Sequence, residues 1–222
     1  CVTRRQRQMC IRDRFEATGR KSEALNANKT GVKLSPHDAE ANNNLGNILK
    51  ELGRLGEAEV SYNQALLLKP DYAEAHCNLG ILLHHSGKLD KAEASYRQAI
   101  ALKPEFPEAY SNLGITLQEA GKLKEADASY NRAIELSPGY AEAHSNLGNM
   151  LKELGRLDEA EASYKQAIAL EPNLAEAHNN LGTTLQELGR LEEAKARWKQ
   201  SLLLQPNFFD GVRNLVKLPV GQ

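Results

Sequence analysis

The chain has 222 residues, a formal net charge of −1 and only 5% aromatic residues. Its charge is unevenly distributed, because residues 1–33 hold nine Lys and Arg against three Asp and Glu, whereas the remainder holds 19 against 26. The mildly acidic remainder argues against nucleic acid as a main partner, since phosphate binding needs a basic face.

The cysteines Cys1, Cys10 and Cys77 share no paired spacing, so the sequence predicts neither a disulfide framework nor a zinc site. No apolar run approaches the roughly 18 residues that a membrane span needs. The first residues also lack the apolar core of a signal peptide. We therefore expect a soluble cytoplasmic protein without a membrane partner.

The chain begins with the basic stretch CVTRRQRQMCIRDR, which has no helical apolar periodicity. One interpretation is a basic arm for nucleic acid or anionic lipid. The stretch starts with Cys rather than Met, and it resembles strings that arise when sequencing adapters are translated. We therefore predict that residues 1–14 are a non-native head without a structural role.

Residues 15–38 predict half of a repeat. Counting back 34 residues from the recurring features of the next segment lands on Gly19, Ala24, Leu34 and Pro36. This register indicates the second helix of a degraded repeat whose first helix is lost. Asn28 and Gly31 stand where later repeats have an aromatic residue and a small residue, so we expect poor packing there.

A repeat of 34 residues dominates the rest of the chain. Self-similarity at a fixed period of this length predicts one supersecondary unit stacked on copies of itself. Five full repeats follow one another, at 39–72, 73–106, 107–140, 141–174 and 175–208. Positions within a repeat are numbered 1 to 34 below.

Each repeat contains two helical patterns. In the fourth repeat, His144, Leu147, Gly148 and Leu151 fall on one arc of the first helix. A Gly at position 15 is expected to end the first helix, and a Pro at position 32 to stop the second. A short loop makes the pair antiparallel. Small residues at positions 8 and 20 predict a close crossing, with the aromatic residue at position 24 filling the space beyond them.

Residues 209–222 begin another first helix but do not complete it. Val216 stands where the repeats have Gly, and Pro219 stands where they have a core Leu. We predict a short capping helix ending near Lys217, followed by a truncated tail. A stacked array needs such a cap because its last repeat otherwise leaves an apolar face in water.

The pattern L-G-x-x-L…G…A-x-x-x-Y-x-x-A…P over 34 residues resembles the tetratricopeptide repeat (TPR), and the resemblance covers 39–208. It implies an all-α fold, a right-handed α-solenoid of antiparallel helix pairs (TPR superhelix). The departures are modest: position 4 carries Asn, His or Tyr where the family often has Trp, and the last repeat has Trp198 and Ser201 at positions 24 and 27.

Catalytic and metal chemistry is not predicted. His76, His144 and His178 recur at position 4, but neighbouring helix axes are ~8–10 Å apart and metal–nitrogen bonds are ~2 Å long. We therefore interpret these histidines as packing residues. No phosphate-binding loop, nucleophile elbow or zinc-protease motif occurs, and carboxylates lie on regularly repeated faces. We expect no cofactor, no metal and no enzyme activity in the visible chain.

The other arc of the first helix is the candidate binding surface. Positions 2, 6, 9 and 13 lie together on it, and in TPR proteins this arc lines the concave groove where peptides bind. Position 2 is Glu in every repeat. Position 6 is Asn throughout: Asn44, Asn78, Asn112, Asn146, Asn180 and, in the predicted cap, Asn214. A subtype that binds C-terminal carboxylates needs Lys and Arg here, and only Lys50 and Lys152 are available.

The row of asparagines resembles the N-terminal repeats of O-GlcNAc transferase and its bacterial relatives, where asparagines hold an extended polypeptide backbone. The leading function is thus a protein- or peptide-binding scaffold. The alternative is a recognition module of a truncated glycosyltransferase or sulfotransferase whose catalytic domain lies beyond Gln222, and a third is mere spacing. Duplication could also have copied a structural Asn that bonds a neighbouring helix.

Overall fold

A computed structural model of the chain describes residues 19, 23 and 25–206. The described residues are helical, with no strand among them, and the prediction of an all-α fold is confirmed. The chain divides into two compact units, Cys1–Pro104 and Glu105–Gln222. In the described part, no helix has both the length and the apolar character that crossing a membrane would require.

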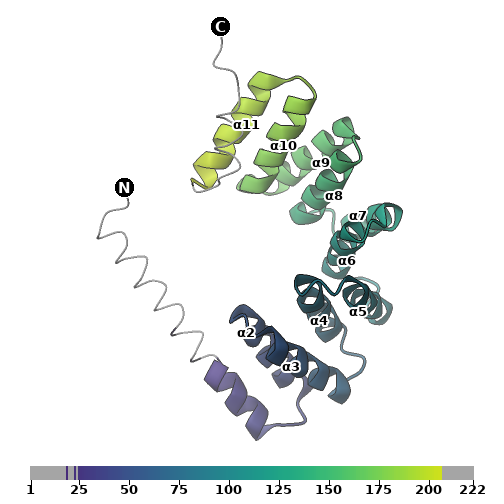
Figure 1. The fold of residues 1–222 in the computed structure, drawn as a ribbon, viewed down its shortest axis with the longest axis vertical. Helices are drawn as coiled ribbons and strands as arrows, with labels where there is room; N and C mark the ends of the chain where they lie inside the picture. The colour runs from purple at the N-terminus through teal and green to yellow at the C-terminus, as the bar shows by residue number, and fades with distance from the viewer. Residues whose placement is uncertain (1–18, 20–22, 24, 207–222) are drawn as a thin grey trace, which may run out of the picture. The chain divides into compact units, whose positions relative to one another are not determined.

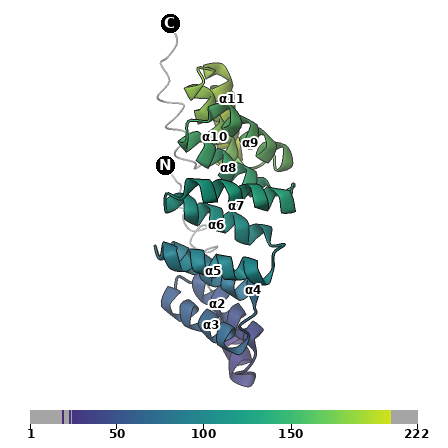
Figure 2. The same ribbon diagram turned by 90° about the vertical axis from the view of Figure 1, so that its right-hand side faces the viewer.

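The first unit contains two complete helix pairs. They are α2 (Ala39–Glu51) with α3 (Leu55–Leu68), and α4 (Ala73–His85) with α5 (Leu89–Leu102). The helices of each pair pack closely, α3 also packs on α4, and the two first helices α2 and α4 touch. The antiparallel course of each pair can be followed in Figures 1 and 2. The unit therefore consists of stacked helical hairpins.

The second unit contains three pairs built in the same way. They are α6 (Pro107–Glu119) with α7 (Leu123–Leu136), α8 (Ala141–Glu153) with α9 (Leu157–Leu170), and α10 (Ala175–Glu187) with α11 (Leu191–Leu204). Here α7 packs on α8 and α9 on α10. The first helices α6, α8 and α10 also touch in succession, so their outward arcs form one continuous surface.

The turn inside each hairpin depends on the Gly at position 15. All five of these glycines have positive φ, between 70° and 78°, a region that residues with a Cβ rarely adopt. In the first repeat the N–H of Arg54, just after the glycine, donates to the carbonyl of Leu49 at 2.9 Å. Every second helix ends two residues before its proline. Both predicted stop signals are confirmed.

The crossing of the two helices in a pair is closer than the sequence indicated. A Cβ built on Gly148 would lie 2.8 Å from Cε1 of Tyr164, and one built on Gly46 would lie 2.6 Å from the Tyr62 ring. The aromatic side chain therefore packs directly on the glycine rather than beyond it. Ala160, at position 20, is fully buried at the same crossing.

The predicted half-repeat contributes one described helix, over residues 25–34. Leu25 is buried, whereas Leu34 is 79% exposed and the space around Gly31 is open to 4 Å. The domain bounds assigned to residues 15–38 and to the five repeats stay predictions. The basic head, residues 1–14, and the predicted cap, residues 209–222, lie outside the described residues.

Candidate functional site

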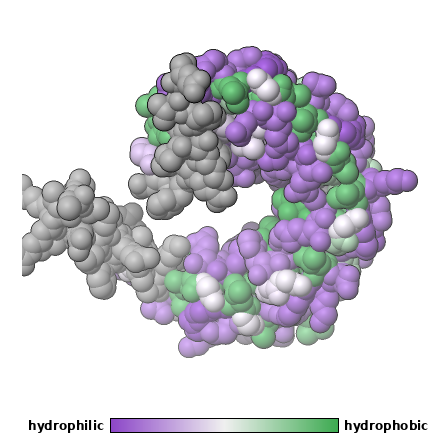
Figure 3. Space-filling model, turned by 45° about the horizontal axis from the view of Figure 1, so that its top comes forward, coloured by the Kyte–Doolittle hydropathy of each residue, from purple (hydrophilic) through white to green (hydrophobic). Residues whose placement is uncertain are grey.

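The first-helix face is defined here as the outward arc of the first helices, at repeat positions 2, 6, 9, 12 and 13. In the second unit it runs over α6, α8 and α10. Most of its side chains are exposed or half-buried and polar. Figure 3 shows that hydrophilic residues dominate the visible surface, with hydrophobic residues interspersed among them.

The structure places the predicted site residues at equivalent points of this face. Asn44 on α2 is exposed, and the others in the described part are half-buried: Asn78, Asn112, Asn146 and Asn180. Asn214 lies outside the described residues. These side chains belong to different repeats, so each can contribute a single carboxamide to any one stretch of a bound chain.

Three of these asparagines donate to the preceding first helix. The Nδ2 group of Asn78 donates to Oδ1 of Asn43 at 3.0 Å. The equivalent bond from Asn146 to the hydroxyl of Ser111 is longer, at 3.4 Å. Asn112 is different, because its side chain makes no hydrogen bond with a residue that the structure describes. The row therefore has a structural component, as the duplication hypothesis required.

The third such bond belongs to a network around Asn149, at position 9. Nδ2 of Asn180 donates to Oδ1 of Asn149 at 2.8 Å, and the hydroxyl of Tyr164 donates to the same oxygen at 2.7 Å. A carbonyl oxygen has two lone pairs, so this oxygen is fully used. The N–H groups of Asn149 make no hydrogen bond with described residues, so they are the part of the amide left for a ligand.

Sequence reasoning placed position 9 on this arc but did not identify the hydrogen bond that its asparagines accept from a tyrosine. The sequence signal for this position is that Asn occurs there twice, as Asn47 and Asn149. Each accepts from the tyrosine hydroxyl of its own repeat at 2.7 Å. In the third repeat Ile115 stands at position 9, and Gln118 accepts the Tyr130 hydroxyl instead, at 3.0 Å. In each of these three repeats the tyrosine hydroxyl thus donates a hydrogen bond to an amide oxygen on the first-helix face.

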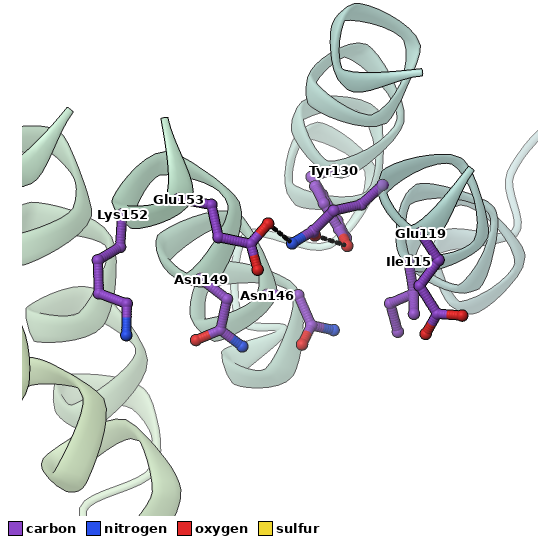
Figure 4. Close-up of a pocket in the computed structure, with 8 residues that line it drawn as sticks. Ile115, Glu119, Tyr130, Asn146, Asn149, Lys152 and Glu153 are labelled. Carbon is purple, nitrogen blue, oxygen red and sulfur yellow. Dashed lines mark hydrogen bonds between the residues drawn. The ribbon is translucent and has the colours of Figure 1, made fainter. Parts of the chain in front are cut away.

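A hollow of about 320 Å³ opens on this face between α6 and α8. Its lining is polar except for one isoleucine: Ile115, Gln118, Glu119, Tyr130, Asn146, Asn149, Lys152 and Glu153. Figure 4 shows Asn146, Asn149 and Lys152 projecting from α8, with Ile115 and Glu119 across the hollow. Gln118 spans one edge, donating to Glu153 at 2.6 Å while it accepts from Tyr130.

The hydroxyls beneath this hollow stay protonated. Burial, reinforced by nearby carboxylates, holds the pKa of Tyr130 and Tyr164 well above its ordinary value. Each hydroxyl therefore remains a hydrogen-bond donor at physiological pH. This fixes the orientation of the amide groups of Gln118 and Asn149, which accept from them.

The recurrent histidines connect three of the first helices, α4, α8 and α10, to the loop before each of them. Nε2 lies 3.0 Å from the Pro70 carbonyl in His76, 3.1 Å from that of Pro138 in His144, and 3.0 Å from that of Pro172 in His178. A carbonyl only accepts, so Nε2 donates. Burial lowers the pKa of His178 and favours its neutral form. Among the described residues, no three His, Cys, Asp or Glu side chains gather around one point.

Comparison with known proteins identifies the family. Residues 6–217 match the model of the Cilia and flagella-associated protein 70 C-terminal domain, a TPR family, and the chain belongs to it. Comparison with curated proteins gave no match. The TPR resemblance is thus confirmed, while the finer resemblance to O-GlcNAc transferase arrays stays a prediction.

Solved structures share the fold. A thermophilic TPR protein of Thermus thermophilus, TTC0263, is 28% identical, with a TM-score of 0.67 over 80% of this chain and 97% of that one. YrrB, described as a TPR protein with an unusual peptide-binding site, is 24% identical, with a TM-score of 0.63 over 87% and 100%. Pseudomonas aeruginosa pilF is 16% identical, with a TM-score of 0.77 over 92% and 93%. The last two show the fold alone.

Proposed function

We propose that this TPR protein is a binding scaffold that holds an extended segment of another protein on its first-helix face. The observation behind the proposal is the hollow between α6 and α8, which joins an asparagine of the predicted row, Asn146, to the oriented amide of Asn149. The N–H groups of Asn149 can donate to a peptide C=O, and Oδ1 of Asn146 can accept from a peptide N–H. They would hold the backbone without reading its sequence.

The spacing of the repeats suits an extended ligand. If successive first helices lie ~10 Å apart, a chain advancing ~3.4 Å per residue passes one repeat about every three residues. Each repeat would then meet a new peptide unit. Specificity would come from position 12, and from position 9 in the repeats that lack Asn there, because the residues at position 5 are buried. YrrB, which shares the fold, is described as having an unusual peptide-binding site, and this supports a peptide as the class of ligand.

The enzyme-module alternative rests on the asparagine resemblance alone and stays an expectation. The structural role of the asparagines, in contrast, is compatible with binding. Asn78 and Asn146 use an N–H group to bridge to the preceding helix, and their Oδ1 atoms make no hydrogen bond with described residues. One carboxamide can therefore serve both the array and a ligand.

The test selects peptides from a random-sequence library with the 222-residue chain and measures their affinity for variants. Asn146→Ala combined with Asn149→Ala should weaken binding about tenfold, the effect of losing one or two backbone hydrogen bonds. Asn63→Ala, at an exposed position on α3, serves as the control and should leave the affinity unchanged. Peptides that bind both variants like the original chain would contradict the proposal.

A further inference from the structure

The glutamates of the second helices are largely neutralised within the molecule. They pair with Lys or Arg of the same helix, of the turn before it, or of the next repeat: Glu57 with Arg54, Glu59 with Lys88, Glu93 with Arg97, Glu135 with Arg132, Glu159 with Arg156, and Glu161 with Lys165 and Arg190. The glutamates of these helices therefore contribute little uncompensated charge.

The glutamates at position 2, on the first-helix face, behave differently in the two units. In the first unit, position 31 is lysine in both repeats. Lys103 pairs with Glu74 at 3.1 Å, and Lys69 lines a hollow of about 650 Å³ together with Glu40 and Glu74. Position 31 thus places lysines close to the position-2 carboxylates of this unit, and one of these carboxylates, Glu74, forms an ion pair.

In the second unit the lysines are missing. Position 31 holds Ser137, Glu171 and Gln205 in the three repeats. The exposed carboxylates Glu108, Glu142 and Glu176 accordingly form no salt bridge with any residue that the structure describes. The position-2 row therefore has lysines at position 31 beside it in the first unit and none in the second.

Tyr140 lies close to two of these carboxylates, as Tyr72 does to Glu40 and Glu74 in the first unit. Its hydroxyl donates to Glu142 at 3.3 Å. Burial raises the pKa of Tyr140 to about 12, and the carboxylates of Glu142 and Glu108 contribute to the rise. Two carboxylates of consecutive repeats therefore act on one point of the face, as a continuous acidic row would.

We propose that the first-helix face of the second unit docks an extended segment rich in Lys or Arg, whose cations lie along the row Glu108, Glu142 and Glu176. This rests on the proposed function and names the chemistry of the partner. The amides of Asn146 and Asn149 would hold its backbone, while the carboxylates select its side chains. The negative face also disfavours the phosphates of nucleic acid.

The period of such a segment follows from geometry. A polyproline II helix has three residues per turn and a rise of ~3.1 Å per residue, so every third side chain points the same way after ~9 Å. Consecutive first helices lie ~10 Å apart. A basic residue at every third position would therefore meet one glutamate per repeat along the acidic row.

The test uses three fluorescent peptides of equal length, built from Pro-Pro-Arg, Pro-Pro-Gln or Pro-Pro-Glu repeats, and the full 222-residue chain. By fluorescence anisotropy, the Arg peptide should bind about tenfold more tightly than the Gln peptide, as expected for three exposed ion pairs. The Glu peptide should bind most weakly. The preference for Arg should shrink as ionic strength rises, because exposed charges are screened by salt.

Two variants and a matched control locate the interaction. Glu108→Gln, Glu142→Gln and Glu176→Gln together should remove the preference for Arg. Glu40→Gln with Glu74→Gln, in the first unit, where position 31 supplies lysines, should retain it. Installing lysines at position 31 of the second unit, through Ser137→Lys, Glu171→Lys and Gln205→Lys, should also remove it. Unchanged thermal midpoints show that each variant is folded.

The outcomes separate this inference from the proposed function. If Arg and Gln peptides bind equally and both depend on Asn146 and Asn149, the inference is overturned and the binding function stands. If none of these three peptides binds but library peptides do, the inference alone is overturned; if neither kind binds, both are overturned. An equal loss of Arg preference in the first-unit control would also overturn the inference, because it would indicate general charge attraction instead of this row.

Discussion

At the scale of single residues, the asparagines at position 6 combine a helix-propensity cost with very different hydrogen bonding. Asn is about 0.5 kcal/mol less favourable than Ala inside a helix. Asn180 offsets this by donating to Asn149 and accepting from Asn179 at 3.2 Å. Asn112 has no such side-chain bond with a described residue. The two positions therefore allow the structural part of the row to be measured.

We expect Asn180→Ala to lower the free energy of unfolding by about 1 kcal/mol, since two hydrogen bonds at ~0.5–1.5 kcal/mol each outweigh the gain in propensity. Asn112→Ala should instead raise it by about 0.5 kcal/mol. Urea unfolding followed by circular dichroism checks both. Equal midpoints for the two variants would mean that the bonds around Asn180 add nothing to stability.

At the scale of the helices, two neighbouring glycines of the first unit have opposite roles although the space around both is open. Gly53 ends α2 with φ of 72°, whereas Gly56 lies inside the first turn of α3. Gly53→Ala should cost about 1–2 kcal/mol because of its left-handed conformation. Gly56→Ala should stabilise the protein by up to about 1 kcal/mol.

Thermal unfolding of the two glycine variants gives the measurement, and the sign of the shift is the criterion. A raised midpoint for Gly53→Ala would contradict the role of the left-handed turn. A lowered midpoint for Gly56→Ala would show that its missing side chain matters for something other than propensity.

The helices were predictable because their limits are marked by single residues with strict backbone requirements, the Gly at position 15 and the Pro at position 32. The composition of the face was also readable, as Asn and Glu recur at positions 6 and 2. The hydrogen-bond partners of the tyrosine hydroxyls beneath this face could not be predicted. Whether Tyr164 donates to Asn149, or Tyr130 to Gln118, depends on which polar group the crossing brings near the hydroxyl. The distance between a hydroxyl and its acceptor depends on how the two helices pack, and no periodic pattern in the sequence encodes it.

At the scale of each stacked unit, the repeats hold together through their interfaces with neighbours. One such link in the second unit is ionic, and it joins the fourth repeat to the fifth. Arg190, which precedes α11, pairs with Glu161 of α9 at 2.7 Å. The Glu161 side chain is only 10% exposed, so this pair is better shielded from solvent than the pair of Lys195 with Glu192.

The pH dependence of stability tests this link. Burial alone would raise the pKa of Glu161, but its hydrogen bonds with Lys165 and Arg190 outweigh that effect and lower the pKa below the ordinary 4.5. A carboxyl whose pKa is depressed in the folded state contributes stability that is present above its unfolded pKa. That contribution is lost as the pH falls through the folded value.

We therefore expect Glu161→Gln to be less stable than the original chain at pH 7, with the difference shrinking as the pH falls from about 5 toward 3. Glu192→Gln is the control, because Glu192 pairs with Lys195 on the exposed surface of one helix and such pairs contribute little. Urea midpoints across this pH range provide the measurement. A difference for Glu161→Gln that stays constant down to pH 3 would show that the carboxylate acts through packing, and the link between the fourth and fifth repeats would then be steric instead of ionic.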